Sequence, residues 1–172
     1  PLVIPFDVAL QGALNGQASL VRQALDSGTH PDQRDGDGRT MLMVSAFNGH
    51  TGTVGELLAA GASSDVRDRA GRTALMFAST GKNRDTVALL LANKAQINLI
   101  DGQEGWTALM FAAAEGHRSI VELLLQHGAD PTVIDVDEST AESFARDNGH
   151  TDLADLIRES AKGFRSAPRG AN

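Results

Sequence analysis

The chain has 172 residues and no cysteine, and its 22 Asp and Glu outnumber its 15 Lys and Arg, for a formal charge of −7. This balance disfavours a general nucleic-acid binder, because such proteins gain affinity by neutralising phosphates with basic side chains. The lack of cysteine excludes disulfides, thiol catalysis and cysteine-ligated zinc. The sequence contains no run of about 18 apolar residues, so we expect no membrane-spanning segment.

The first part of the chain predicts an extended segment followed by a helix pair. Residues 1–5 contain two prolines, which disfavour a helix, so we expect them to be extended. The helix pair should then be interrupted at Asn15 and Gly16. Its polar Asp7 and Gln11 stand where the corresponding pairs further along carry threonine and an apolar residue. Such replacements are expected of a terminal unit, which has one face in water.

Further along the chain, one pattern of two helices recurs. A threonine followed by apolar residues occurs at Thr40, Thr73 and Thr107, 33 and then 34 residues apart, with a weaker copy at Thr140. We expect each threonine to be the N-cap of a short apolar helix. A second helix follows in each copy, with its apolar residues on one side. Neither helix can bury its apolar face alone, so each pair needs copies of itself on either side.

This period of about 33 residues, made of a turn and two helices, resembles the ankyrin-repeat family over residues 6–160. The compact array also resembles small bacterial ankyrin proteins, some of which are exported. The resemblance implies an all-α solenoid of about five helix-turn-helix units, with hairpin-like finger loops and terminal caps. We expect the units at residues 6–34, 35–67, 68–100, 101–134 and 135–160. The polar segment 161–172 is expected to be a disordered tail.

Two features depart from the family pattern. The family's threonine is followed by proline, leucine and histidine, whereas the histidine position here holds Met43, Met76 and Met110. The threonine–histidine hydrogen bonds of the family therefore cannot form, and we expect a stack of packed methionines in their place. The segment 99–106 is one residue longer than its counterparts, which lengthens one finger beside Trp106, the only tryptophan.

The residues predict no catalytic or metal site. His50, His117 and His150 occupy equivalent positions, but stacked helices lie about 8–10 Å apart, so histidines two units apart would be about 20 Å apart. We expect them to stabilise the turn between paired helices. The string 79–83 lacks the glycine and the hydroxyl residue that a phosphate-binding loop needs. We expect carboxylate pairs such as Asp135 and Asp137 to lie in finger loops open to water, where nothing prepares them for acid–base catalysis.

The resemblance implies that partner contacts come from variable positions in the fingers and at the end of each first helix. In this chain these positions are Asp37, Arg39, Phe47, Asn48, Arg69, Arg72, Thr80, Gln103, Glu104, Trp106, Glu115 and Asp137. We expect a recognition patch centred on Phe47, Arg72 and Trp106, because aromatic residues and arginine dominate interface energetics. Trp106→Ala should then weaken binding and leave folding intact. In the alternative, the Trp106 ring only folds over the lengthened finger and fastens it.

Together with the resemblance, the sequence predicts a non-enzymatic protein–protein interaction module that is monomeric on its own. Its partner should be another protein and not a nucleic acid, and it should need no cofactor or metal. The alternative is a small-molecule or metal-binding receptor, or a cryptic enzyme, which would need an enclosed pocket of roughly 300 Å³ or more. A structural spacer would be uniformly polar on its concave side, unlike Phe47 and Trp106. The chain starts at Pro1 without an initiator methionine, which indicates a processed or trimmed start, so cytoplasmic and periplasmic or secreted locations stay open.

Overall fold

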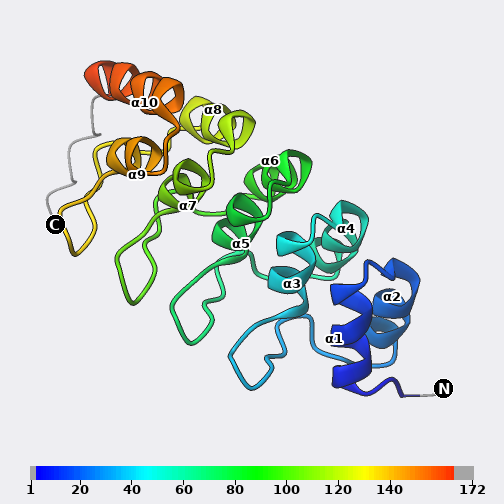
Figure 1. Cartoon of the computed structure of the whole chain (residues 1–172). Coiled ribbons are helices and arrows are strands. Elements are labelled where there is room, and N and C mark those ends of the chain that lie inside the picture. Colours follow the sequence, from blue (N-terminus) through cyan, green and yellow to red (C-terminus); the bar gives the residue numbers. More distant parts are fainter. Residues whose placement is uncertain (1–2, 165–172) are drawn as a thin grey trace, which may run out of the picture.

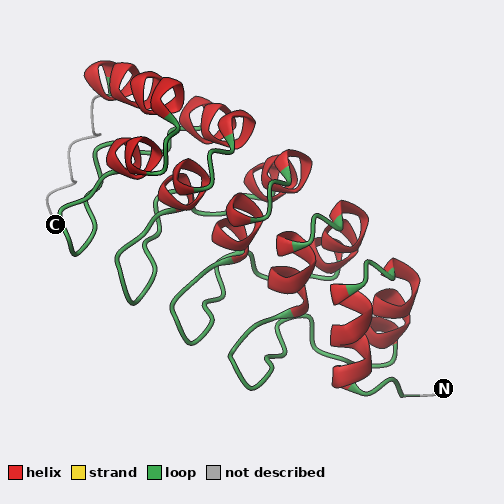
Figure 2. Cartoon of the chain, viewed as in Figure 1, coloured by secondary structure: helices red, strands yellow, loops and turns green. Residues whose placement is uncertain are grey.

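The computed structural model describes residues 3–164, which form a row of stacked helix pairs (Figure 1). The helices of this part of the chain are α1 (Phe6–Leu14), α2 (Ala18–Asp26), α3 (Met41–Phe47), α4 (Thr51–Ala59), α5 (Ala74–Thr80), α6 (Arg84–Ala92), α7 (Ala108–Ala114), α8 (Arg118–Gln126), α9 (Ala141–Asp147) and α10 (Thr151–Gly163). The odd-numbered helices form one row and the even-numbered helices form the other. Helices and loops make up the described residues, with isolated β-bridges only (Figure 2). The predicted all-α solenoid is confirmed.

Four long loops project from the same side of the stack (Figure 1). We name them finger A (30–40), finger B (63–73), finger C (96–107) and finger D (130–140). Backbone hydrogen bonds join each finger to the next, from Arg69 N to Asp37 O (3.0 Å), from Gly102 N to Ala70 O (2.8 Å) and from Val136 N to Glu104 O (3.0 Å). The fingers therefore form a ladder that holds neighbouring units in register.

Each of the four threonines predicted as caps is the N-cap residue of a first helix. The Thr40 hydroxyl accepts a hydrogen bond from Met43 N at 3.3 Å, and Met43 Sδ accepts one from Thr40 N at 3.4 Å. Thr107 and Met110 repeat this reciprocal pair at the same distances. The methionines therefore do more than pack, because their sulfur atoms accept the N–H at the start of the helix.

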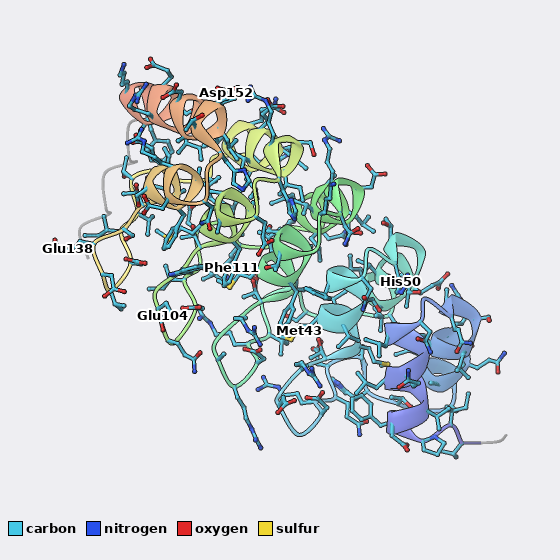
Figure 3. The ribbon with its side chains drawn as sticks, viewed as in Figure 1. Met43, His50, Glu104, Phe111, Glu138 and Asp152 are labelled. Carbon is cyan, nitrogen blue, oxygen red and sulfur yellow. The ribbon has the colours of Figure 1, made fainter. Side chains whose placement is uncertain are left out.

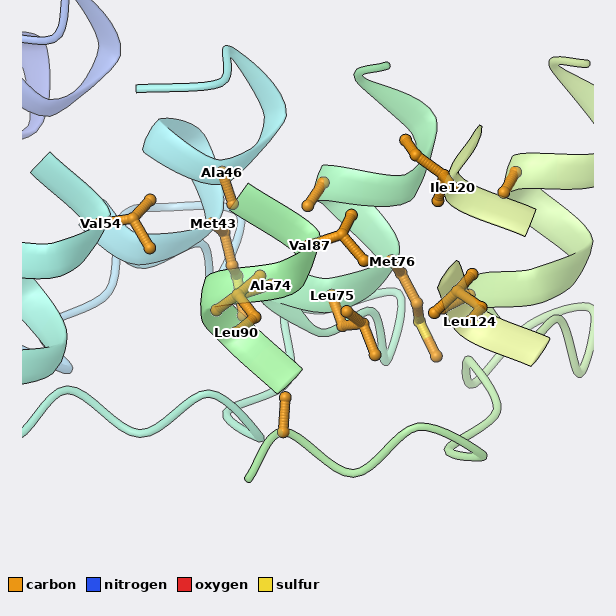
Figure 4. Packing of buried hydrophobic residues seen from close by; sticks show 14 of the residues in the cluster. Met43, Ala46, Val54, Ala74, Leu75, Met76, Val87, Leu90, Ile120 and Leu124 are labelled. Carbon is orange, nitrogen blue, oxygen red and sulfur yellow. The ribbon is translucent and has the colours of Figure 1, made fainter. Parts of the chain in front are cut away.

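One apolar core runs along the whole stack between the two rows of helices. Met43, Met76 and Met110 are all at most 2 % exposed, among the buried valines and leucines of the second helices. Figure 4 shows part of this cluster, including Met43, Met76, Val87 and Leu90. Among the described residues, the main contacts of each unit are with its neighbours, as α5 lies against α3 and α7. The core is therefore a line of neighbour contacts.

The two ends of the chain differ in how well the sequence predicts them. Residues 3–5 are not helical and α1 starts after Pro5, whose ψ of 148° is extended. At the other end, residues 161–163 belong to α10, so the prediction that the tail begins at residue 161 is wrong. The helix continues because an ion pair between Lys162 and Glu159 (2.7 Å) supports its last turn until Gly163 ends it. Residues 165–172 lie outside the described residues.

Within residues 3–164, no helix is both long and apolar enough to cross a membrane.

Candidate protein-binding surface

Aromatic side chains line the first helices. Phe77, Phe111 and Phe144 each lie four residues after the N-cap threonine of α5, α7 and α9, and all three are partly buried. Phe47, at the end of α3, is 45 % exposed and contacts the Phe77 ring edge to face, with centroids 6.4 Å apart and planes at 88°. The Arg72 guanidinium carbon lies over the Phe77 ring, 4.6 Å from its centroid. We call Phe47, Phe77 and Arg72 the N-side cluster.

A second aromatic group surrounds Trp106. Its ring lies 5.1 Å from Phe111 and 4.3 Å from Phe144, between centroids, so it bridges two units. Its Nε1–H donates to Asp135 Oδ2 at 3.0 Å. We call Trp106, Phe111 and Phe144 the C-side cluster. The Trp106 side chain therefore does more than fasten its own lengthened finger, because it also contacts two first helices and the next finger.

These contacts also change the expected effect of truncating Trp106. Trp106→Ala removes two ring contacts and leaves Asp135 Oδ2 without this donor, so it lowers stability as well as removing a side chain from the surface. The expectation that this variant leaves folding intact is corrected for that reason. Trp106 is consequently a poor probe of binding on its own.

The residue before each N-cap threonine is anchored by a buried or half-buried aspartate at the base of a finger. Arg39 Nε donates to Asp35 Oδ2 at 2.9 Å, while Arg72 donates to Asp68 Oδ2 through both Nε (3.0 Å) and Nη2 (2.8 Å). Because a bidentate arginine is fixed in orientation, Arg72 is held over Phe77 before any partner arrives. The side chains of Arg39 and Arg72 are therefore preorganised.

The Asp35 carboxyl has a shifted pKa. Burial alone raises this pKa, but hydrogen bonds from the Arg39 N–H, the Arg39 side chain and the Asp37 N–H, together with the charge of Arg39, outweigh burial and hold the pKa below its ordinary value. The backbone bonds to Asp35 Oδ1 measure 2.8 Å from Arg39 N and 2.9 Å from Asp37 N. The folded finger therefore favours the ionised carboxylate.

This shift predicts how stability depends on pH. A group whose folded pKa is depressed stabilises the fold above its unfolded pKa, and this contribution is lost as the pH falls through the folded pKa. We expect the free energy of unfolding to decrease below about pH 4, and to decrease less steeply in Asp35→Asn, which cannot titrate there. Urea unfolding at several acidic pH values measures both slopes. Identical slopes for the two proteins would contradict a stabilising Asp35 carboxylate.

The other residues predicted to contact a partner fall into two groups. Asn48 Nδ2 donates to Val44 O at 3.0 Å and the Thr80 hydroxyl donates to Met76 O at 3.0 Å, so both are engaged within their own helix ends. The remaining side chains are exposed at the fingers or just after a first helix, and they are Asp37, Arg69, Gln103, Glu104, Glu115 and Asp137. Among these, Asp37 pairs with Arg39 at 3.3 Å.

Sequence reasoning missed several residues of this surface. Phe77, Phe111 and Phe144 were not predicted to belong to this surface, although their repeated spacing after the threonine was a usable signal. Three exposed apolar residues in fingers C and D were also missed, namely Ile100, Ile134 and Val136. They carry no periodic signal of their own, since the corresponding positions of fingers A and B are arginine or glycine.

The histidines after the first helices link neighbouring units. His50 Nε2 lies 2.9 Å from Leu14 O and His117 Nε2 lies 3.0 Å from Thr80 O, while Asn83 Nδ2 donates to Phe47 O at 2.9 Å in the unit between. Leu14 and Thr80 directly precede the turn between the paired helices of the preceding unit, so His50 and His117 stabilise such a turn, as expected, but across a unit boundary. Within residues 3–164, no group of three or more His, Asp and Glu side chains is placed to hold a metal ion.

Comparisons with known proteins agree with this architecture. A family model for ankyrin repeats in three copies matches residues 9–101, and a model for a single ankyrin repeat matches residues 104–136. A comparison with curated proteins gave no match. The first match covers helices α1 to α6, and the second covers α7, α8 and most of finger D. Since the first match alone spans more than half of the 172 residues, the chain belongs to the ankyrin-repeat family.

Proposed function

We propose that the chain is a non-enzymatic module that binds a partner protein on the surface formed by its fingers and first helices. Ankyrin repeats are generally protein–protein interaction modules. The observation that carries the proposal for this chain is the N-side cluster, where Phe47 is 45 % exposed beside Phe77 and Arg72. An aromatic ring left half in water next to an oriented arginine is a combination that favours burial against another protein.

The way the N-side cluster is held also favours binding. Arg72 is fixed by two hydrogen bonds to Asp68 and by its position over the Phe77 ring, so little conformational entropy remains to be lost when a partner covers it. Phe47 gains edge contact from Phe77, which limits its orientations. Aromatic residues and arginine supply most of the energy of protein interfaces. We therefore place the centre of the interface at this cluster.

The proposed interface extends from the N-side cluster along the fingers. Its members are Asp37, Arg39, Phe47, Asn48, Arg69, Arg72, Thr80, Gln103, Glu104, Trp106, Glu115 and Asp137. Trp106 packs against Phe111 and Phe144 in the C-side cluster, so this part of the proposed interface is already ordered before a partner binds. We propose that the chain is monomeric when no partner is bound, since each end unit carries polar substitutions such as Gln11 and Arg146.

The test uses Phe47→Ala. A partner captured from the source organism and purified should bind this variant more weakly by about 2 kcal/mol or more, because the variant loses the exposed ring at the centre of the interface. Isothermal calorimetry measures the affinity, and urea unfolding shows that the variant stays folded. The matched control is Gln126→Ala, an exposed residue at the end of α8 in the other row of helices, which should bind like the parent. An unchanged affinity of Phe47→Ala would remove the N-side cluster from the interface.

A further inference from the structure

The four fingers differ sharply in charge. Fingers A and B hold five aspartates and five arginines, so their formal charges cancel. Fingers C and D hold six carboxylates and no lysine, arginine or histidine, and the carboxylates are Asp101, Glu104, Asp130, Asp135, Asp137 and Glu138. Six of the seven net negative charges of the chain are thus accounted for by two adjacent loops. Such a concentrated field selects the sign of charge on any partner that approaches these fingers.

Some of these carboxylates serve the fold. Asp101 Oδ1 accepts hydrogen bonds from successive backbone N–H groups, the shortest from Gly105 at 2.8 Å. Asp135 accepts from Ser139 N at 2.7 Å and from Trp106 Nε1 at 3.0 Å. Asp130 accepts from the Thr132 hydroxyl at 2.6 Å. These three are occupied within the chain.

The other three carboxylates face water. Glu104, Asp137 and Glu138 are exposed, and among the described residues none forms an ion pair or a hydrogen bond with their carboxylate oxygens, although Glu104 N and Asp137 N donate to Asp101 and Asp135. Figure 3 shows Glu104 and Glu138 on neighbouring fingers. Glu138 has a φ of 62°, in the position that Gly38, Gly71 and Gly105 occupy in the other fingers. These charges are free to pair with cations supplied by a partner.

The same two fingers also expose apolar side chains. Ile100, Ile134 and Val136 are 46 %, 59 % and 63 % exposed. Arg34 and Arg67 occupy the positions of Ile100 and Ile134 in fingers A and B. Covering exposed β-branched side chains removes apolar surface from water, which stabilises the resulting complex. Fingers C and D therefore expose both apolar side chains and the unpaired carboxylates of Glu104, Asp137 and Glu138.

The structure holds this surface in one arrangement. Val136 N donates to Glu104 O at 3.0 Å and Trp106 of finger C donates to Asp135 of finger D, so the two fingers are tied by backbone and side chain. In the finger ladder, the carbonyls of Asp37, Ala70 and Glu104 each accept an N–H from the next finger. The corresponding carbonyl of finger D is that of Asp137, and no other described residue donates to it. An incoming backbone N–H would find an acceptor there.

We propose that fingers C and D bind an extended segment of a partner protein in which apolar residues alternate with lysine or arginine. The apolar side chains cover Ile134 and Val136, the cations pair with Glu104, Asp137 and Glu138, and a backbone N–H bonds to the Asp137 carbonyl. An acidic segment would meet the three exposed carboxylates of Glu104, Asp137 and Glu138, whereas Arg67, the cation that reaches finger C, already donates to Ile100 O at 2.7 Å, so charge complementarity favours the basic segment. This inference rests on the proposed function, because it names the chemistry of a partner for the same side of the molecule.

The probe is a short synthetic peptide in which valine alternates with lysine, compared with its counterpart in which glutamate replaces lysine. We expect calorimetry with the full chain to show binding of the lysine peptide only, with an affinity that falls as salt is raised. The triple variant Glu104→Gln, Asp137→Asn and Glu138→Gln should weaken binding by about tenfold or more. The double variant Ile134→Ser and Val136→Ser should weaken it comparably at unchanged net charge.

A second triple variant separates a specific surface from simple attraction to an acidic protein. Asp26→Asn, Asp85→Asn and Asp152→Asn remove the same charge from exposed residues of α2, α6 and α10, and Asp152 lies far from the finger tips in Figure 3. This control should bind the lysine peptide as tightly as the parent. Equal losses in the two triple variants, or no binding of the lysine peptide, would overturn the inference.

Two further results bear on the proposal. Sedimentation of the protein alone could show a dimer that the triple variant Glu104→Gln, Asp137→Asn and Glu138→Gln abolishes. Fingers C and D would then bind a second copy of this chain, and the inference would be wrong. If the lysine peptide fails to bind while Phe47→Ala still weakens the captured partner, the proposed function stands and only this inference fails. Urea unfolding of each variant confirms that it is folded before its affinity is compared.

Discussion

Replacing Leu109 by alanine should lower the free energy of unfolding by about 2–5 kcal/mol. Leu109 is 1 % exposed on α7, which lies in the middle of the stack against both α5 and α9. Truncation removes buried methyl groups and leaves a cavity that two neighbouring units must share, and close-packed helices relax only partly around such a gap. Urea unfolding followed by circular dichroism measures the loss.

The matched comparison is Leu14→Ala, at the end of α1. Leu14 is 42 % exposed in the first unit, where one face has no neighbour, so its truncation should cost less than about 1 kcal/mol. A linear stack predicts this difference, because the energy of a residue depends on how many units contact it. Equal losses at the two positions would contradict the linear arrangement of the core.

The fold could be predicted because its signals are local. Thr40, Thr73 and Thr107 lie at a fixed period, and each begins a helix through contacts that span only three residues. The apolar spacing of the second helices predicts their buried face in the same way, as Val54, Val87 and Val121 are all fully buried. Repetition then supplies the tertiary contacts, since each unit meets a copy of itself.

The surface was harder to predict because its geometry depends on contacts between units. Trp106 was expected to contact a partner or, in the alternative, to fold over its own finger, and neither expectation included its ring contact with Phe144 or its bond to Asp135 of the next unit. The hydrogen bond from the N-cap threonine N–H to the methionine sulfur could not be predicted either, because a methionine at that position indicates only apolar packing. The repeated position of His50 indicated a structural role, but it did not predict that the ring bonds to Leu14 of the preceding unit.

The hydrogen bonds of the finger ladder are the contacts that the sequence predicts least well, because they join backbone atoms of different units. Glycines such as Gly38, Gly71 and Gly105 mark the left-handed turn of each finger, with φ of 77–78°. The sequence cannot tell whether such a glycine is needed only for its φ or also for the space beside it. The structure separates the two requirements, and mutation can do the same.

Gly71→Ala should destabilise the protein by roughly 3 kcal/mol, from two causes. Alanine at a φ of +78° costs about 1–2 kcal/mol in backbone strain, and its Cβ would lie 2.3 Å from Gly102 N, which disrupts the hydrogen bond from Gly102 N to Ala70 O. Gly61→Ala is the control, since Gly61 has a φ of +88° and no atom within 4 Å of its added Cβ. It should therefore cost only the strain, about 1–2 kcal/mol.

Amide hydrogen exchange distinguishes how the Gly71→Ala loss arises. If the ladder couples fingers B and C, the Gly102 amide should exchange faster in Gly71→Ala than in the parent, beyond what the loss of global stability explains. In Gly61→Ala, the exchange rate of Gly102 should change only as much as the loss of global stability predicts. Equal destabilisation by the two substitutions, with Gly102 still protected, would mean that the fingers move apart at no cost. The ladder would then be a consequence of helix stacking, and the rigidity of the finger surface would come from the first helices alone.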